Sequence, residues 1–183
     1  MAVFDLETSG LSSSKDRILQ MAVVLLDHDG VVSTTWSTYV RPTNVLTTDL
    51  GPRHIHGIRR RDVLLAPGER HAMNRFAELT AHRVVVAHNA RFDMGFVRAA
   101  ATRHGIDLDW TGVMCTLDLS RRLDPERRRL HKLSDVCERY GVELGHAHDA
   151  LHDATATATV LPHLLREHGL ARWDASYQDL LLV

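Results

Sequence analysis

The chain has 183 residues, 44% of them hydrophobic and 25% charged, with a formal net charge of −1. This length suits one well-packed domain with a buried core. No stretch approaches the roughly 20 consecutive apolar residues of a membrane span, and the N-terminus lacks the basic and apolar regions of a signal peptide. The net charge argues against a protein that coats DNA by bulk electrostatics, but an enzyme can still bind a few phosphates locally. We expect a cytoplasmic protein without membrane contact.

The cysteine and arginine content further limits the kinds of protein that this chain can be. Cys115 and Cys137 are the only cysteines, and neither belongs to a close Cys/His pair, so we expect buried, reduced thiols. Most of the 13 histidines stand alone in polar stretches. The basic residues are 20 Arg and only 2 Lys, with Arg runs at 59–61, 121–122 and 127–129. Arginine binds phosphate well, but a short basic run is more often a solvated face.

The N-terminal part of the chain predicts a three-stranded meander. Residues 2–6 form a short apolar run, residues 17–27 a longer β-branched run, and residues 31–40 alternate after a turn. We expect the first strand to be central. The segment 42–67 holds three of the five prolines and little periodicity, which predicts a surface loop with one helical turn.

Helices and strands then alternate along the chain. Hydrophobic spacing predicts helices over 69–82, 89–104, 116–123, 131–140 and 149–168, and strands over 84–88 and 113–116. Pro162 falls inside the apolar stripe of the last helix and is expected to kink or divide it. These elements predict a single α/β domain with a mixed sheet.

Acidic residues stand at distant places where a strand ends or a helix begins. Asp5 and Glu7 are two apart in a predicted strand and therefore share a face, although this spacing alone is a weak signal. Asp93 lies on the first turn of a predicted helix, where the helix dipole already favours an acid. His88 and Asn89 stand just before it at the strand exit.

His148 and Asp153 flank the start of the last predicted helix. If that helix begins at residue 149 or 150, His148 lies in the loop before it and Asp153 on its first turns, facing the sheet. This division suits a fixed carboxylate for a metal and a movable imidazole for proton transfer. Carboxylates gathered from distant segments need a cation, and oxygen ligands suit Mg²⁺ or Mn²⁺. The residues predict a metal-dependent nuclease.

Three motifs in this order resemble those of a known family. D-x-E-T, H-N-A-x-F-D and H-x-A-x-x-D-A begin at Asp5, His88 and His148. They resemble the DEDDh 3′–5′ exonucleases, and within them the proofreading type similar to the epsilon subunit of bacterial DNA polymerase III. The resemblance spans residues 2–166. It implies an RNase H-like three-layer domain with a five-stranded sheet over 1–168, and a short tail over 169–183 packed on or next to it.

The resemblance also implies a reaction and its residues. The enzyme would hydrolyse phosphodiester bonds at the 3′ end of single-stranded or frayed nucleic acid and release nucleoside monophosphates. Two Mg²⁺ or Mn²⁺ ions would take part, with His148 as general base. The implied metal ligands are Asp5, Glu7, Asp93 and Asp153. The implied substrate contacts are Thr8, Leu11, His56, Asn89 and Phe92.

Several alternatives stay open at this point. DNA is favoured over RNA, with an exoribonuclease or an enzyme that trims short oligonucleotides as the alternative. Other candidates are a small-molecule metallophosphatase and a non-catalytic module that binds nucleic-acid ends or a polymerase. The presence of all four predicted metal ligands and of His148 argues against the non-catalytic module. Ser9 stands where the family often has Thr, which is a mild change. Only four residues precede Asp5, so we expect either a trimmed N-terminus or a start codon placed too far downstream. The brief C-terminal tail favours a free-standing enzyme, with a polymerase as the alternative partner.

Overall fold

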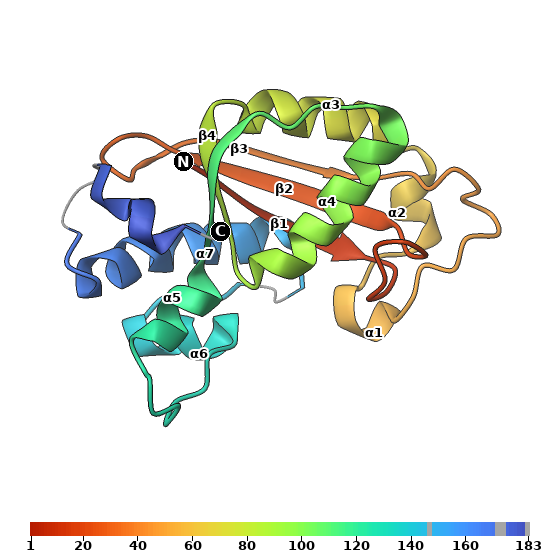
Figure 1. Ribbon diagram of the computed structural model, residues 1–183. Coiled ribbons are helices and arrows are strands. Elements are labelled where there is room, and N and C mark those ends of the chain that lie inside the picture. The colour runs from red at the N-terminus through yellow and green to blue at the C-terminus, as the bar shows by residue number, and fades with distance from the viewer. Residues whose placement is uncertain (146–147, 171–174, 182–183) are drawn as a thin grey trace.

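A mixed five-stranded sheet forms the centre of the molecule (Figure 1). The computed structural model describes residues 1–145, 148–170 and 175–181. The strands are β1 (Ala2–Thr8), β2 (Ile18–Leu26), β3 (Val32–Tyr39), β4 (Arg83–Ala87) and β5 (Trp110–Cys115). Their order is β3-β2-β1-β4-β5, with antiparallel pairing among the first three strands and parallel pairing of β1 with β4 and of β4 with β5. The predicted meander and the central place of the first strand are confirmed.

Helices cover both faces of this sheet and make three layers. The α3 helix (Glu69–Thr80) and the α4 helix (Ala90–His104) pack on one face, where Phe4 of β1 is buried. The α5 (Thr116–Arg122), α6 (Leu133–Tyr140) and α7 (Ala150–Glu167) helices pack on the other face, where Val3 is buried. Side chains alternate along a strand, so Asp5 and Glu7 lie on the same face as Val3, toward α7. The predicted α/β class is confirmed.

Two short helices, rather than one helical turn, lie between β3 and α3. They are α1 (Arg53–His56) and α2 (Arg60–Leu64). Ile58 and Val63 pack with Leu19 and Leu50 in a small buried cluster. This cluster orders a segment whose sequence has little periodicity. Gly57 ends α1 with a φ of 68°, a left-handed conformation that glycine adopts without strain.

Sheet pairing extends two strands beyond their predicted ends. β1 continues to Thr8, and Glu7 pairs with Gln20 of β2. β5 begins at Trp110, which pairs with Arg83. Both extensions depend on a neighbouring strand, which a local hydrophobic pattern does not reveal. The two cysteines are free and buried, as predicted.

The α7 helix is uninterrupted, so of the two effects expected of Pro162, a kink or a division, the division is wrong. A proline in a helix interior costs about 3 kcal/mol. Leu161, Leu164 and Leu165 are buried around it, and burial of each such side chain contributes about 1.5–3 kcal/mol. Packing on the sheet therefore outweighs the proline.

The C-terminal tail is described only in part. Residues 171–174 and 182–183 of the predicted tail lie outside the described residues. The short 3₁₀ helix η1 (Ala175–Leu180) precedes Leu181, which forms a β-bridge with Met114 of β5. Among the helices that the structure describes, none is long and apolar enough to cross a membrane.

Candidate active site

A cavity of about 570 Å³ opens where β1 and β4 end and α7 begins. The end of β1 forms its floor, α1 contributes one wall, and the residue after β4 and the first residue of α6 contribute others. All ten predicted site residues line this cavity: Asp5, Glu7, Thr8, Leu11, His56, Asn89, Phe92, Asp93, His148 and Asp153. The fold therefore brings together side chains from segments that are far apart in sequence.

Glu7, His148 and Asp153 form the tightest group in the cavity. One ligand atom from each lies within 4.8 Å of the others. The backbone N–H of His148 donates to Asp153 Oδ2 at 3.2 Å, while Asp153 Oδ1 is buried without a hydrogen-bond partner among the described residues. A buried carboxylate oxygen without a partner is costly. This oxygen is a fitting ligand for a cation.

Burial and mutual repulsion oppose ionisation of the site carboxylates. Burial, followed by the charge of Asp93, raises the pKa of Asp5 well above its ordinary value. Burial, followed by the charge of Asp153, raises the pKa of Glu7 to about 8. Burial likewise raises the pKa of Asp93 to about 8 and raises that of Asp153. A bound divalent cation would reverse this balance because it favours the charged carboxylates.

Asp93 reaches the cavity from the first turn of α4. Its side chain is buried, and the backbone N–H of Leu6 stabilises its charged form. Asn89 caps α4 with a left-handed φ of 63° and makes no side-chain capping hydrogen bond. The Asn89 side chain is exposed at the cavity. Its amide can therefore serve a ligand without disrupting the helix start.

Apolar side chains of α1 and of the loop after β1 line one side of the cavity. Ile55 of α1 is 46% exposed, and Leu11 of the loop is 88% exposed. His56 is buried, and both of its ring nitrogens bond the backbone, Nε2 to the Leu50 carbonyl and Nδ1 to the Ile58 N–H. Burial lowers the pKa of His56, which favours the neutral ring. His56 therefore offers the cavity a ring surface and no free nitrogen.

Two further predicted contacts have local partners. The Thr8 hydroxyl donates to the Gly10 carbonyl at 2.7 Å and fixes the turn after β1. The Phe92 ring packs on Phe96 with ring centroids 5.1 Å apart. Thr8 keeps its acceptor capacity for a ligand, and Phe92 presents a ring that a neighbouring ring holds in place.

His88 is a neutral element of the cavity wall. Its Nε2 donates to the His131 carbonyl at 3.0 Å, and its Nδ1 accepts from the Thr116 hydroxyl at 3.0 Å. Burial lowers the pKa of His88 to about 4. Since both nitrogens are engaged and the ring is neutral, His88 is not a candidate proton acceptor.

Sequence reasoning missed Gln20 and Asp149. Gln20 is 5% exposed; its Nε2 donates to Asp149 Oδ2 at 3.1 Å, and its Oε1 accepts from the Ala150 N–H at 3.3 Å. The other Asp149 oxygen accepts from Leu151 and His152 backbone N–H groups and caps α7. The available signal was that Gln20 is the single polar residue in the apolar strand ILQMAVVLL.

Comparisons with known proteins support one family. The RNase_T exonuclease family matches residues 2–161. The DNA polymerase III PolC-type of Latilactobacillus sakei subsp. sakei (strain 23K) is 37% identical over 171 residues, which are 90% of this chain and 11% of that protein. The chain thus spans only a small part of its polymerase relatives.

Solved structures share the fold. E. coli Exonuclease I in complex with a dT13 oligonucleotide has a TM-score of 0.80 at 22% identity, over 92% of this chain and 41% of that one. Exonuclease X in complex with 5′ overhanging duplex DNA has a TM-score of 0.72 at 25% identity, over 96% and 95% of the two chains. The chain belongs to the RNase_T exonuclease family, the DEDD 3′–5′ exonucleases of the RNase H-like superfamily.

Proposed function

We propose that this chain is a metal-dependent 3′–5′ exonuclease that removes terminal nucleotides from single-stranded or frayed DNA. The observation that carries the proposal is the convergence of four carboxylates and one imidazole on a single cavity. These residues come from β1, from the start of α4 and from the start of α7. Membership of an exonuclease family supports the reaction class.

The residues present fit a pair of Mg²⁺ or Mn²⁺ ions. Asp5, Glu7, Asp93 and Asp153 would hold them, because carboxylate oxygens are the ligands that these hard cations prefer. The unpartnered Asp153 oxygen and the raised pKa values both support a cation in this place. When bound, such ions supply charge neutralisation at the scissile phosphate and make water a stronger acid.

His148 would accept the proton of the attacking water. Its imidazole is exposed, and a ring nitrogen lies within 4.8 Å of both Glu7 and Asp153 oxygens. The bond from the His148 backbone N–H to Asp153 positions the residue without occupying its ring. The water oxygen would then bond to phosphorus while the bond from phosphorus to the 3′ oxygen of the preceding nucleotide breaks. That oxygen would take up a proton from solvent, and a nucleoside monophosphate would be released.

The remaining cavity residues would hold the terminal nucleotide. Leu11, His56 and Phe92 offer apolar and ring surfaces, which accept any base by contact and stacking. Thr8 has an acceptor and Asn89 has an amide for the polar edge of the sugar. This arrangement favours a substrate recognised by its end and backbone rather than by its sequence.

The relatives support DNA and a replication context. Exonuclease I and Exonuclease X were each solved with DNA, which favours DNA over RNA for this chain. The polymerase III relatives contain a matching segment within a much longer protein, which supports proofreading for a polymerase as the role of the activity.

A labelled-strand assay tests the proposed function. We expect mononucleotides to be released stepwise from the 3′ end of a 5′-labelled single strand with Mg²⁺ or Mn²⁺, and no release in EDTA. A panel of DNA and RNA strands of equal sequence and varied length measures sugar preference and minimum length. Internal cuts, shortening from the 5′ end or activity in EDTA would contradict the proposal.

A further inference from the structure

The basic loop 123–132, between α5 and α6, ends at the wall of the cavity. The His131 carbonyl accepts the hydrogen bond from His88, and Leu133 lines the same cavity as His88. Four residues of chain span at most about 14 Å, so Arg129 stands within that distance of Leu133 along the chain. A substrate strand that left the cavity on this side would pass the loop within a few nucleotides.

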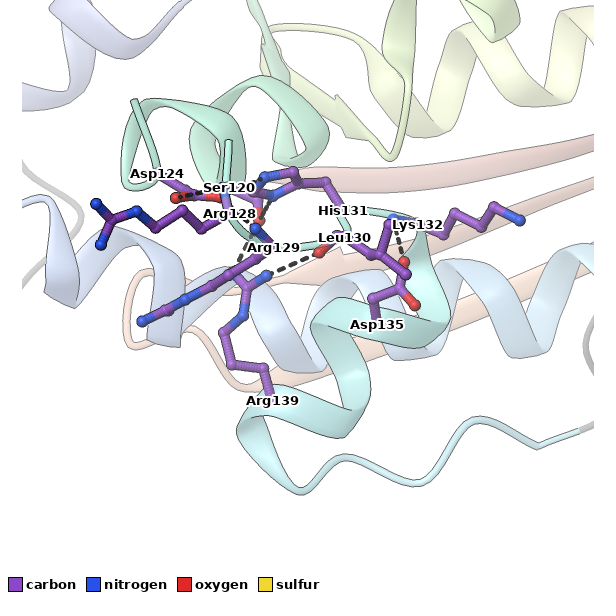
Figure 2. A network of polar contacts seen from close by, with 9 residues as sticks. All are labelled: Ser120, Asp124, Arg128, Arg129, Leu130, His131, Lys132, Asp135 and Arg139. Atoms are coloured by element: carbon purple, nitrogen blue, oxygen red, sulfur yellow. Dashed lines mark hydrogen bonds and ion pairs between the residues drawn. The ribbon is translucent and has the colours of Figure 1, made fainter. Parts of the chain in front are cut away.

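A buried carboxylate fixes the backbone of this loop. Asp124 is 8% exposed; its oxygens accept from the backbone N–H groups of Arg128 at 3.2 Å and Arg129 at 2.8 Å, and from His131 Nε2 at 3.1 Å. His131 Nδ1 in turn bonds the Ser120 hydroxyl at 2.8 Å. Figure 2 shows the ends of the Arg128 and Arg129 side chains directed away from this network. Asp124 therefore shapes the arginine run without neutralising its guanidinium groups.

Two guanidinium groups of the run are free to bind a ligand. Arg127 and Arg129 are exposed, and their guanidinium groups have no acceptor among the residues that the structure describes. Arg128 pairs with Glu126, and Arg139 donates to the Leu130 carbonyl from the other side of the loop. A fixed backbone lowers the entropy that an arginine loses when it binds phosphate.

The other long arginine run, 59–61, is used differently. Arg60 donates to the carbonyls of Val45 and Thr48, and Arg61 pairs with Asp62. The Arg60 contacts attach α2 to the preceding loop, whereas the Arg61–Asp62 pair lies within α2. The two runs look equivalent in sequence, but the structure engages the Arg60 and Arg61 side chains in the first run and leaves those of Arg127 and Arg129 without an acceptor among the described residues.

We propose that Arg127 and Arg129 bind the phosphodiester backbone of the single-stranded substrate a few nucleotides before its 3′ end. The segment 121–132 carries six cationic side chains and two acids, whereas the described residues that line the cavity include four acids and no Lys or Arg. Cations beside the cavity would draw the strand in and hold it between successive cleavages. The inference rests on the proposed function, because it assigns the path of that same substrate.

The test compares Arg127→Gln/Arg129→Gln with Arg83→Gln/Arg98→Gln. Arg83 begins β4 at the end opposite the cavity, and Arg98 lies beside a different cavity, so the control makes the same change in charge elsewhere. Binding of a fluorescent oligothymidylate of about 12 nucleotides is measured by anisotropy in an Asp153→Asn background. We expect the loop substitutions to raise the dissociation constant about tenfold and to lower the salt dependence by about one to two charges.

Hydrolysis separates this inference from the proposed function. The parent protein with Mn²⁺ is assayed on the p-nitrophenyl ester of thymidine 5′-monophosphate, which fills only the cavity, and on the same strand. We expect the ratio of the hydrolysis rate on the strand to that on the ester to be about tenfold lower in Arg127→Gln/Arg129→Gln than in the parent. A parent that cleaves neither substrate refutes the proposed function. Equal strand affinity in the loop variant and its control refutes the arginine path, whatever the hydrolysis result.

Discussion

The side-chain amide of Gln20 joins β2 to the start of α7 across 129 residues of sequence. Its Nε2 donates to Asp149 at 3.1 Å, and its Oε1 accepts from the Ala150 N–H at 3.3 Å. Gln20 is also the sheet partner of Glu7 on β1. One buried amide therefore fixes the beginning of the helix that carries Asp153 beside the strand that carries Glu7.

We expect Gln20→Ala to reduce catalysis more than binding. Loss of both hydrogen bonds lets the start of α7 move relative to β1, and misplacement by about 1 Å can cost about 10²-fold in rate. The turnover number should fall about 10–10²-fold with a small change in KM, while more Mn²⁺ is needed for half-maximal activity. Stability should fall by about 1–3 kcal/mol, because buried partners lose their hydrogen bonds. Steady-state kinetics, metal titration and urea unfolding measure these effects.

Ser37→Ala is the matched control for Gln20→Ala. The Ser37 hydroxyl accepts one long hydrogen bond of 3.5 Å from the Gln20 amide and has no other side-chain partner among the described residues. Its removal therefore leaves the link to α7 intact. Parent-like turnover is expected. If Gln20→Ala lost stability but kept the parental turnover and Mn²⁺ requirement, the amide would be structural only.

Asp5→Asn should abolish activity without destabilising the metal-free protein. The substitution removes a ligand and one charge from a cluster whose members already repel one another. Activity should fall by at least about 10²–10³-fold, the range seen when one charge-stabilising group is removed from an active site. The melting temperature in EDTA should equal or exceed that of the parent.

Asp107→Asn provides the comparison for Asp5→Asn, since Asp107 is exposed and lies outside the cavity. It should leave both rate and melting temperature unchanged. Near-parental turnover in Asp5→Asn would remove Asp5 from the metal site.

Local sequence patterns predict much of the candidate site. Strand periodicity alone places Asp5 and Glu7 on one face, and helix-start signals place Asp93 and Asp153 on first turns. These features depend on residues only a few positions apart. The central place of β1 also follows from the acids, since the strand that carries Asp5 and Glu7 must lie near the other site residues.

Local sequence patterns do not predict features that depend on partners far away in the sequence. The Gln20–Asp149 bond joins segments that no local pattern relates. The α1 and α2 helices form because a small apolar cluster, which includes Leu19 of β2, orders an aperiodic segment. Pro162 is tolerated because α7 is held along the sheet by its buried leucines. Tertiary packing overrides local propensity in each case.

We expect His148→Ala to slow hydrolysis about 10²–10⁴-fold, the usual contribution of a positioned general base. Added imidazole should restore part of the rate, because a small base can occupy the space that the side chain leaves. His148 also lies close enough to Glu7 and Asp153 to share a cation with them. Titration with Mn²⁺ separates the two roles, since a lost ligand raises the Mn²⁺ requirement and a lost base does not.

His71→Ala is the control for this substitution, because His71 is exposed on α3 and lies outside the cavity. It should behave as the parent does, with or without imidazole. A His148→Ala protein that keeps the parental rate would show that another group takes the proton.

The metal-free protein should become less stable as the pH rises from about 4 to about 8. Burial raises the pKa of Glu7 and of Asp93 from ordinary values of 4.5 and 3.8 to about 8. Between these limits the folded chain holds protons that the unfolded chain has released. Because stability falls with pH wherever the folded state binds more protons, the loss should accumulate across this interval and level off above it. Urea unfolding in EDTA at several pH values measures the profile.

The variant Glu7→Gln/Asp93→Asn isolates these two groups from the histidines and other residues that titrate in the same interval. Its unfolding free energy should depend less on pH than that of the parent, and the difference between the two profiles is the contribution of the two carboxyls. Mn²⁺ at pH 8 should stabilise the parent, since it binds the folded chain preferentially, and should stabilise the variant much less. Parallel profiles for parent and variant in EDTA would mean that the Glu7 and Asp93 carboxyls are already ionised without a metal. Binding of a cation would then release no protons from them.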